Sequence, residues 1–177
     1  MIFRGRAYRG HDPSWSFAPT SGEGARLTGG RFNRKGDPAL YLSCDAVTAV
    51  MEITQGFTNR LPPITLCEYD VDCADIADLR DAAAQASYNI KPSDMACGWL
   101  SHQIAGRVAP SQAIAKRLRG RGYAGALVPC YVPGATAGDI NLVLWQWGPE
   151  LPHKISVFDP NRRLPKNQIS WPRTDTP

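Results

Sequence analysis

The sequence predicts a single α+β domain. Strand patterns dominate both ends of the chain, helix patterns dominate its middle, and the length of 177 residues is enough to bury one hydrophobic core. No internal repeat and no linker divides the chain. We therefore place the folded domain at residues 1–160 and a polar C-terminal tail at residues 161–177.

The first part of the chain is expected to consist of short strands and loops. Ile2–Arg9 has the composition of a strand, whereas residues 11–28 are rich in Gly, Ser and Pro without a hydrophobic period, which predicts a loop. Two short strands, Arg31–Asn33 and Ala39–Ser43, are predicted on either side of a turn that contains Gly36-Asp37-Pro38.

A helix is predicted directly after these strands. Asp45 suits the N-cap position, because its side chain can accept hydrogen bonds from the first free backbone amides of a helix. Val47, Val50, Thr54 and Phe57 then recur at helical spacing.

The rest of the chain is expected to contain further helices and then strands. The predicted elements are, in order, a strand at Ile64–Val71, helices at Ala77–Ala86, Ser93–Gly106 and Pro110–Gly120, and strands at Ala124–Pro129, Ile140–Trp147 and Lys154–Phe158. Proline is tolerated in the first turn of a helix, so Pro110 marks the start of the last helix well.

Composition points to a soluble protein of a reducing cytoplasm. The five cysteines are an odd number and form no CxxC pair, so neither a disulfide framework nor a zinc site is indicated. No apolar run is long enough for a signal peptide or a membrane span. The net charge of +4 comes partly from basic residues at 116–121 and 162–166, but no aromatic residues interleave with the first group. An acidic protein partner or a phosphate-bearing small molecule explains this charge as well as nucleic acid does.

Arg31 is the first candidate for a functional residue. It follows Gly29-Gly30, which permit a close backbone approach or a positive φ angle. A guanidinium group offers a rigid fork of donors that matches phosphate oxygens, whereas lysine is a point charge. The alternative is a solvated arginine beside a turn.

Glu52 is the second candidate. Between Ala46 and Asn59 it is the only charged side chain, and a helix built merely for solubility normally carries several. The helix is therefore expected to be largely enclosed, with its carboxylate either paired structurally or retained for chemistry. Together with Arg31, the carboxylate favours a site for an anionic ligand with a bond to be ionised.

Three aromatic or basic residues nearby are ambiguous. Tyr41 lies on a predicted strand and suits a core position as well as a binding site, and the pair Tyr8-Arg9 is ambiguous in the same way. His11 is one of three histidines and is a weaker candidate for a general base.

Seven ordered blocks of this sequence resemble motifs of the RES domain, a family known mainly as the toxin half of bacterial toxin-antitoxin pairs. The blocks are Tyr8-Arg9, residues 21–25, residues 29–33, residues 36–43, Met51-Glu52, residues 123–129 and residues 141–144. The resemblance implies a fold similar to ADP-ribosyltransferases of the diphtheria-toxin kind, with NAD bound as the substrate in a cleft of a split β-sheet.

The resemblance also implies roles for individual residues. Arg31 and Glu52 match the arginine and glutamate of the family, and Tyr41 joins them as a catalytic candidate. The family typically has a serine after its Val-Pro pair, where this chain has Cys130. Either Cys130 takes over a positioning role, or another hydroxyl such as that of Ser43 contributes, or the serine is dispensable. The residues expected to bind NAD are Tyr8, Arg9, Arg31, Tyr41, Ser43, Cys130 and Asn141.

The expected reaction is cleavage of the bond between nicotinamide and ribose, without a metal ion. Transfer of ADP-ribose to a bacterial protein is favoured, the alternatives being destruction of NAD by water or phosphate, and a non-catalytic module that binds an antitoxin. The resemblance implies an antitoxin partner with an Xre-type helix-turn-helix domain, through which contact with nucleic acid would be indirect.

Overall fold

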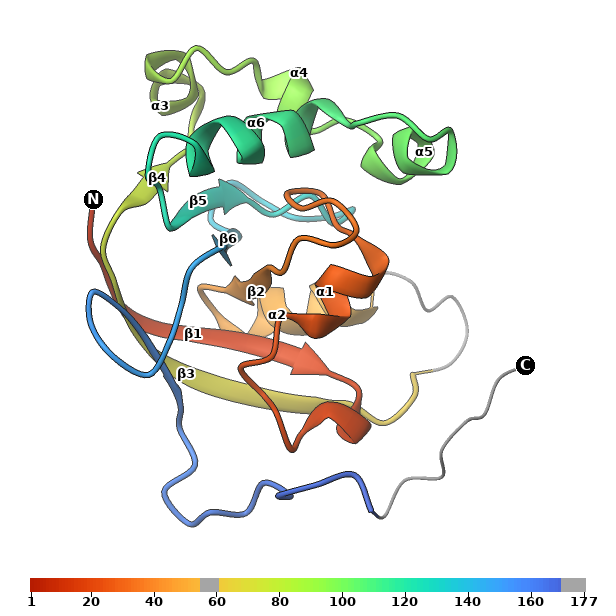
Figure 1. The fold of residues 1–177 in the computed structure, drawn as a ribbon, viewed down its shortest axis with the longest axis vertical. Coiled ribbons are helices and arrows are strands. Elements are labelled where there is room, and N and C mark those ends of the chain that lie inside the picture. Colours follow the sequence, from red (N-terminus) through yellow and green to blue (C-terminus); the bar gives the residue numbers. More distant parts are fainter. Residues whose placement is uncertain (55–60, 170–177) are drawn as a thin grey trace.

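The fold is built on one seven-stranded sheet with helices packed on it (Figure 1). The computed structural model describes residues 1–54 and 61–169. The strand order is β4-β5-β6-β2-β1-β3-β7, and only β4 and β5 are parallel among the described pairs. The strands are β1 (Phe3–His11), β2 (Leu40–Ser43), β3 (Thr65–Cys73), β4 (Ile76–Asp78), β5 (Gly125–Pro129), β6 (Ile140–Leu144) and β7 (His153–Val157). The predicted α+β class is confirmed.

The sheet is nearly divided between β1 and β2. Only Tyr8 and Ser43 are recorded as a pair across this junction, whereas nine pairs join β1 to β3, from Phe3 with Cys73 to His11 with Thr65. Strands β4, β5, β6 and β2 form one half-sheet, and β1, β3 and β7 form the other. This arrangement agrees with the split sheet that the resemblance to the RES domain implies.

The helices lie mainly over the first half-sheet. In Figure 1, α3 to α6 form a layer beside β4 and β5, while α1 and α2 lie near β1 and β2. The helices are α1 (Glu23–Thr28), α2 (Ala46–Thr54), α3 (Ala82–Ser87), α4 (Pro92–Met95), α5 (Trp99–Ile104) and α6 (Pro110–Arg119), with a 3-10 turn η1 at Pro13–Trp15.

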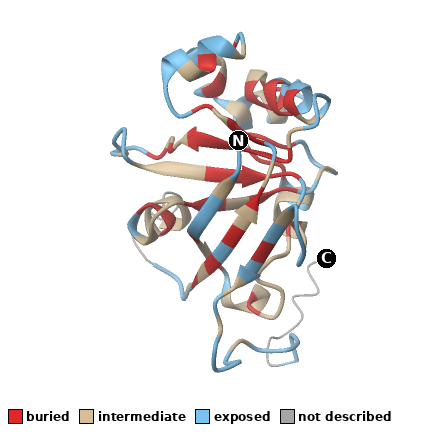
Figure 2. Ribbon diagram, turned by 90° about the vertical axis from the view of Figure 1, so that its left-hand side faces the viewer, coloured by how far each residue is buried: buried red, intermediate tan, exposed pale blue. Residues whose placement is uncertain are grey.

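Successive side chains of β5 and β6 point to opposite faces of the sheet and so contribute to two hydrophobic cores. Ala126, Val128 and Val143 point toward the helical layer, whereas Leu127 and Leu142 point toward the opposite face of the sheet. β5 is buried except at its last residue, and β6 is buried over its last three residues, within a sheet whose buried parts are red in Figure 2. Because β5 and β6 pack against a core on each face, their main chains are well suited to position the side chains of a functional site.

Two expectations for the first part of the chain were wrong. The segment 11–28 contains α1, which has no side-chain N-cap bond and begins with an ion pair between Glu23 and Arg26 rather than with a hydrophobic period. Arg31–Asn33 is not a strand, because it forms a tight turn closed by a bridge between Gly30 and Asn33.

Two predicted helices in the middle were also placed wrongly. Ala77 and Asp78, the first two residues of the expected helix Ala77–Ala86, belong to β4, since pairing with β5 overrides their helix propensity. The helix α3 starts only after its N-cap Asp81. The expected helix Ser93–Gly106 is two short helices, α4 and α5, separated at Cys97-Gly98.

Other expectations are confirmed. Asp45 caps α2, because its carboxylate accepts hydrogen bonds from the backbone amides of Val47 and Thr48. Pro110 is the first residue of α6, and the remaining predicted strands are present with boundaries shifted by a few residues. Phe57 lies outside the described residues.

Candidate active site

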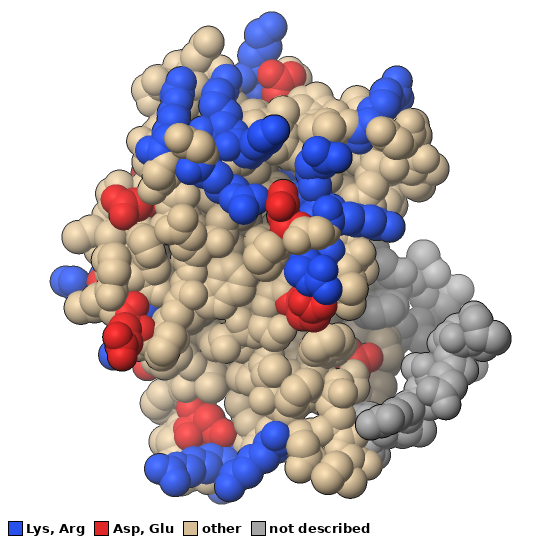
Figure 3. Space-filling view, viewed as in Figure 1, with Lys and Arg blue, Asp and Glu red and all other residues tan. Residues whose placement is uncertain are grey.

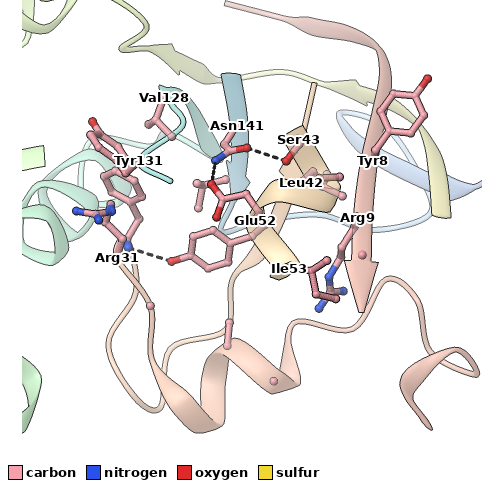
Figure 4. A pocket seen from close by; sticks show the side chains of 18 of the residues that line it. Tyr8, Arg9, Arg31, Leu42, Ser43, Glu52, Ile53, Val128, Tyr131 and Asn141 are labelled. Carbon is pink, nitrogen blue, oxygen red and sulfur yellow. Dashed lines mark hydrogen bonds between the residues drawn. The ribbon is translucent and has the colours of Figure 1, made fainter. Parts of the chain in front are cut away.

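A pocket with a volume of about 400 Å³ opens where β1, β2 and β6 meet α1 and α2. Seven of the eight residues expected from the sequence line it, and they come from positions as far apart as Tyr8 and Asn141. Figure 4 shows Glu52 in its centre, with Arg31 and Tyr131 on one side and Arg9 and Ile53 on the other. The predicted residues that line the pocket are Tyr8, Arg9, Arg31, Tyr41, Ser43, Glu52 and Asn141.

The Glu52 carboxylate accepts hydrogen bonds from two side chains, one on β6 and one directly after β5. Its Oε1 accepts a hydrogen bond of 2.5 Å from Asn141 Nδ2 and one of 3.2 Å from Cys130 Sγ. Glu52 lies on α2, of which only Val47 is exposed, so the expectation of a mostly enclosed helix is confirmed. Two donors on one oxygen fix the plane of the carboxylate toward the pocket.

Asn141 is itself held in place by Ser43. The two residues are directly paired on β6 and β2, and Ser43 Oγ donates a hydrogen bond of 2.8 Å to Asn141 Oδ1. Because the amide oxygen is occupied by a hydroxyl donor, the amide nitrogen faces Glu52. Ser43 also pairs with Tyr8 across the sheet division, so this relay starts at the junction of the two half-sheets.

Cys130 lies beside Glu52 rather than on the pocket wall. It is buried at the end of β5, and burial raises the pKa of its thiol to about 11. At neutral pH the group is therefore a protonated hydrogen-bond donor and not a thiolate nucleophile. Of the roles left open by the sequence, its geometry matches positioning of the glutamate.

The guanidinium of Arg31 is anchored through one of its nitrogens. Nη1 donates to the carbonyl oxygens of Met95 at 3.0 Å and Cys97 at 2.7 Å, in the segment between α4 and α5. The guanidinium carbon lies 4.4 Å from the centre of the Tyr131 ring, a cation-π contact. In the described part of the chain Arg31 forms no ion pair and no hydrogen bond through Nε or Nη2.

The turn that carries Arg31 is held by side chains from distant elements. Ser111 Oγ donates to the Arg31 carbonyl at 2.7 Å, and Gln112 Nε2 donates to the carbonyls of Gly30 and Asn33 at 3.0 and 3.1 Å. Both side chains are buried in the first turn of α6. The main chain of the turn is thus fixed independently of any ligand.

The two glycines before Arg31 are required for different reasons. Gly29 has a φ angle of +74°, in the left-handed region that other residues rarely adopt. A Cβ atom on Gly30 would lie 2.6 Å from the Tyr41 hydroxyl and 2.7 Å from Asn33 Oδ1. Both reasons expected from the sequence therefore apply, one at each glycine.

Tyr41 supports the same turn from β2. Its hydroxyl accepts a hydrogen bond of 2.9 Å from the Phe32 amide and donates one of 2.8 Å to Asn33 Oδ1. Burial raises the pKa of this phenol above its usual value, so it stays protonated. The ring lines the pocket, whereas the hydroxyl is hydrogen-bonded to the turn that carries Arg31.

Tyr8 and Arg9 are neighbours on β1 and point in opposite directions. Figure 4 shows the Tyr8 ring directed away from Glu52, whereas the Arg9 guanidinium reaches below Ile53. Arg9 Nη1 donates to the carbonyls of Pro19 and Ser21 at 3.0 and 2.9 Å, and burial lowers its pKa. Like Arg31, Arg9 has no ion pair among the described residues.

His11 lies outside the pocket lining. Its Nε2 is 3.3 Å from Ser16 Oγ, and burial lowers its pKa to about 4. The imidazole is therefore neutral at physiological pH and belongs to the packing of the segment after β1.

Sequence reasoning missed two aromatic residues of the pocket, Tyr131 and Trp99. Tyr131 directly follows Cys130, but nothing in the local pattern distinguishes it from a core residue. Trp99 begins α5, which the sequence placed in the interior of one longer helix. Both reach the pocket because α4, α5 and the end of β5 converge on Arg31.

Lys and Arg side chains gather over the part of the front face formed by the helical layer (Figure 3). Lys116 and Arg117 on α6, and Arg121 directly after it, are exposed. Within residues 1–54 and 61–169 no group of three potential metal ligands occurs. No helix in the same ranges is long and apolar enough to cross a membrane.

The sequence was compared with models of known protein families. A family model described as the RES domain matches residues 6–167. The chain belongs to the RES domain family. The RES model thus includes every residue that lines the pocket.

This RES domain is also similar to a solved structure described as the crystal structure of the M. tuberculosis MbcT-MbcA toxin-antitoxin complex. The identity is 22%, the match covers 90% of this chain and 84% of the other, and the TM-score is 0.61. At this identity the similarity establishes a shared fold. No curated protein matches the chain significantly.

Proposed function

We propose that this protein cleaves the bond between nicotinamide and ribose in NAD and transfers the ADP-ribose group to a bacterial protein. One observation carries the proposal. The pocket is lined by the oriented carboxylate of Glu52 and by two arginines, Arg9 and Arg31. Neither arginine forms an ion pair within the described residues. A dinucleotide supplies both an anionic diphosphate, which suits Arg31, and a cationic leaving group, beside which the carboxylate can act.

The reaction requires the pocket to stabilise a developing positive charge. As the bond from ribose C1′ to the pyridinium nitrogen breaks, its electron pair passes to the nitrogen and nicotinamide leaves neutral. The ribose becomes oxocarbenium-like, as in glycoside hydrolysis. Glu52 hydrogen-bonds a ribose hydroxyl and stabilises this charge, and its own orientation is set by Asn141 and Cys130.

Arg31 binds the diphosphate with the nitrogens that do not hold the main chain. Its Nη1 is committed to two carbonyl oxygens, so Nε and Nη2 present the edge that faces a ligand. Tyr41 packs against the nicotinamide, and Arg9 adds positive charge at the other end of the pocket. An acceptor nucleophile then attacks C1′ and loses its proton.

We propose that the cellular setting is a toxin-antitoxin pair in a bacterial cytoplasm. Membership of the RES family and the fold shared with a toxin-antitoxin complex support this proposal. The partner is a cognate antitoxin with an Xre-type helix-turn-helix domain, which covers the pocket and mediates any contact with DNA. The protein's net charge of +4 is suited to an acidic partner surface.

The test is incubation of the purified protein with NAD labelled in its ADP-ribose half, with and without a bacterial lysate. Nicotinamide release together with a labelled protein band supports transfer. Release without a band assigns the acceptor to water, or to phosphate if the rate depends on phosphate concentration. Absence of nicotinamide release by the parent protein under all conditions contradicts the proposed cleavage and favours a non-catalytic antitoxin-binding module.

A further inference from the structure

Trp99 is a pocket residue that the reaction described above does not use. It is half-buried at the start of α5, lines the pocket, and forms no ring-to-ring contact among the described residues. A large aromatic side chain with a free face in a ligand cleft is suited to stacking on a planar ring.

The position of Trp99 relative to Arg31 is set by a shared carbonyl group. The oxygen of Cys97 accepts a hydrogen bond of 2.7 Å from Arg31 Nη1 and one of 2.8 Å from the Trp99 backbone amide. The main chain of Trp99 is therefore held next to the guanidinium of Arg31. Figure 4 places Arg31 to one side of Glu52, so Trp99 belongs to the Arg31 end of the pocket.

The orientation of α5 directs Trp99 toward the glycine turn. Gln103 lies four residues later, on the same face of the helix, and its Nε2 donates a hydrogen bond of 2.9 Å to the Thr28 carbonyl. Trp99 faces the same side as Gln103. The pocket lining near Thr28 includes residues with a small side chain or none, at Gly24, Ala25, Gly29 and Gly30. An indole near small residues in a pocket lining is suited to stacking on a flat heterocycle.

The order of groups in a dinucleotide decides which ring this is. Glu52 acts at the nicotinamide ribose and Arg31 at the diphosphate, so the group beyond Arg31 is the adenosine half. We infer that Trp99 stacks on the adenine of NAD and makes the pocket select a dinucleotide over a mononucleotide. This inference rests on the proposed function, because it takes the substrate from it.

The experiment compares binding of two ligands by calorimetry, ADP-ribose and nicotinamide mononucleotide. Only ADP-ribose carries adenine. We expect Trp99→Ala to weaken ADP-ribose binding about tenfold, the effect of losing one stacked base, and to leave mononucleotide binding within twofold. Trp99→Phe should recover most of the affinity. The matched control is Leu100→Ala, on the same helix but exposed and outside the pocket lining.

Equal weakening for both ligands, unchanged ADP-ribose binding, or no ADP-ribose binding by the parent protein would overturn the inference. Cleavage of NAD by the same parent preparation is measured separately. If ADP-ribose binding depends on Trp99 but NAD is not cleaved, the adenine contact stands and the proposed reaction fails.

Discussion

Asn141 Nδ2 lies 2.5 Å from Glu52 Oε1, although the two residues are 89 positions apart in the sequence. Asn141 is in turn oriented by Ser43 on the neighbouring strand. The sheet therefore helps to orient the carboxylate on α2. A rigid sheet places a reacting group more reproducibly than a loop does, because its side chains are locked by packing on both faces.

Glu52→Gln should lower NAD cleavage by at least ~100-fold, a loss of about 2.7 kcal/mol in transition-state stabilisation. The amide keeps the shape and can still accept from Asn141, but it lacks the negative charge that the oxocarbenium-like ribose needs. Nicotinamide release gives the rate, and Glu68→Gln, on β3 beside the exposed Arg6, is the control. Cleavage by a folded Glu52→Gln protein within a few-fold of the parent would remove Glu52 from catalysis.

Arg31→Lys should weaken both NAD binding and turnover. Lysine keeps the charge, but one ammonium group cannot hold the carbonyls of Met95 and Cys97 and also present a flat fork to the diphosphate. Calorimetric titration with a non-cleavable NAD analogue measures the affinity. Arg34→Lys, at an exposed position three residues later, is the matched control. Equal effects of the two substitutions would argue against a direct contact at Arg31.

Cys130→Ser should retain or raise activity, because a hydroxyl is a better donor to Glu52 than a thiol. Cys130→Ala should lose the free energy of this hydrogen bond, about 1 kcal/mol. Since burial raises the thiol pKa to about 11, iodoacetamide should inactivate the protein slowly at pH 7. Complete loss of turnover in a folded Cys130→Ser protein would require a covalent mechanism.

Ser111→Ala should destabilise the protein by about 1–3 kcal/mol and reduce NAD turnover, although Ser111 is not a pocket residue. The substitution leaves the partly buried carbonyl of Arg31 without its hydroxyl donor. Urea unfolding and nicotinamide release measure the two effects. Ser87→Ala, at the exposed end of α3, is the control. Ser111→Thr should restore turnover if the hydroxyl is what matters, and a parent-like Ser111→Ala protein would show that the turn does not depend on it.

Stability should fall between about pH 6.5 and pH 4 because of His11. Its folded pKa of about 4 is below the usual value of 6.5, so the folded state favours the neutral imidazole. This contribution is fully present above pH 6.5 and is lost as the pH falls toward 4, amounting to about 3 kcal/mol at most. Urea unfolding across this range should show a smaller slope for His11→Asn than for the parent or for His102→Asn. Identical slopes in all three proteins would contradict this assignment.

The sequence predicts which residues form the site better than it predicts the contacts that hold them in place. Arg31, Glu52, Ser43 and Asn141 lie in recognisable motifs, and the structure brings all four to one pocket. The Arg31 segment was nevertheless expected to be a strand. Its conformation depends on Ser111 and other residues about 80 positions away, and no local pattern contains that information.

The same limit explains the misplaced elements of the middle segment. β4 forms because residues 76–78 pair with β5, which is a long-range interaction that outweighs an alanine-rich helix pattern. Trp99 was missed because it was assigned to the interior of a longer helix, whereas it starts α5. By contrast, α2 and α6 were predicted well because Asp45 and Pro110 are local start signals.

The side chains that hydrogen-bond the Arg31 turn affect which substitutions this protein can accept during evolution. Tyr41, Ser111 and Gln112 each bind a different part of the same four-residue main chain, so their substitutions should be strongly epistatic. Substitutions in the first turn of α6 can therefore abolish the proposed activity while every pocket residue is retained. A list of pocket residues alone would then misjudge which homologues are still active.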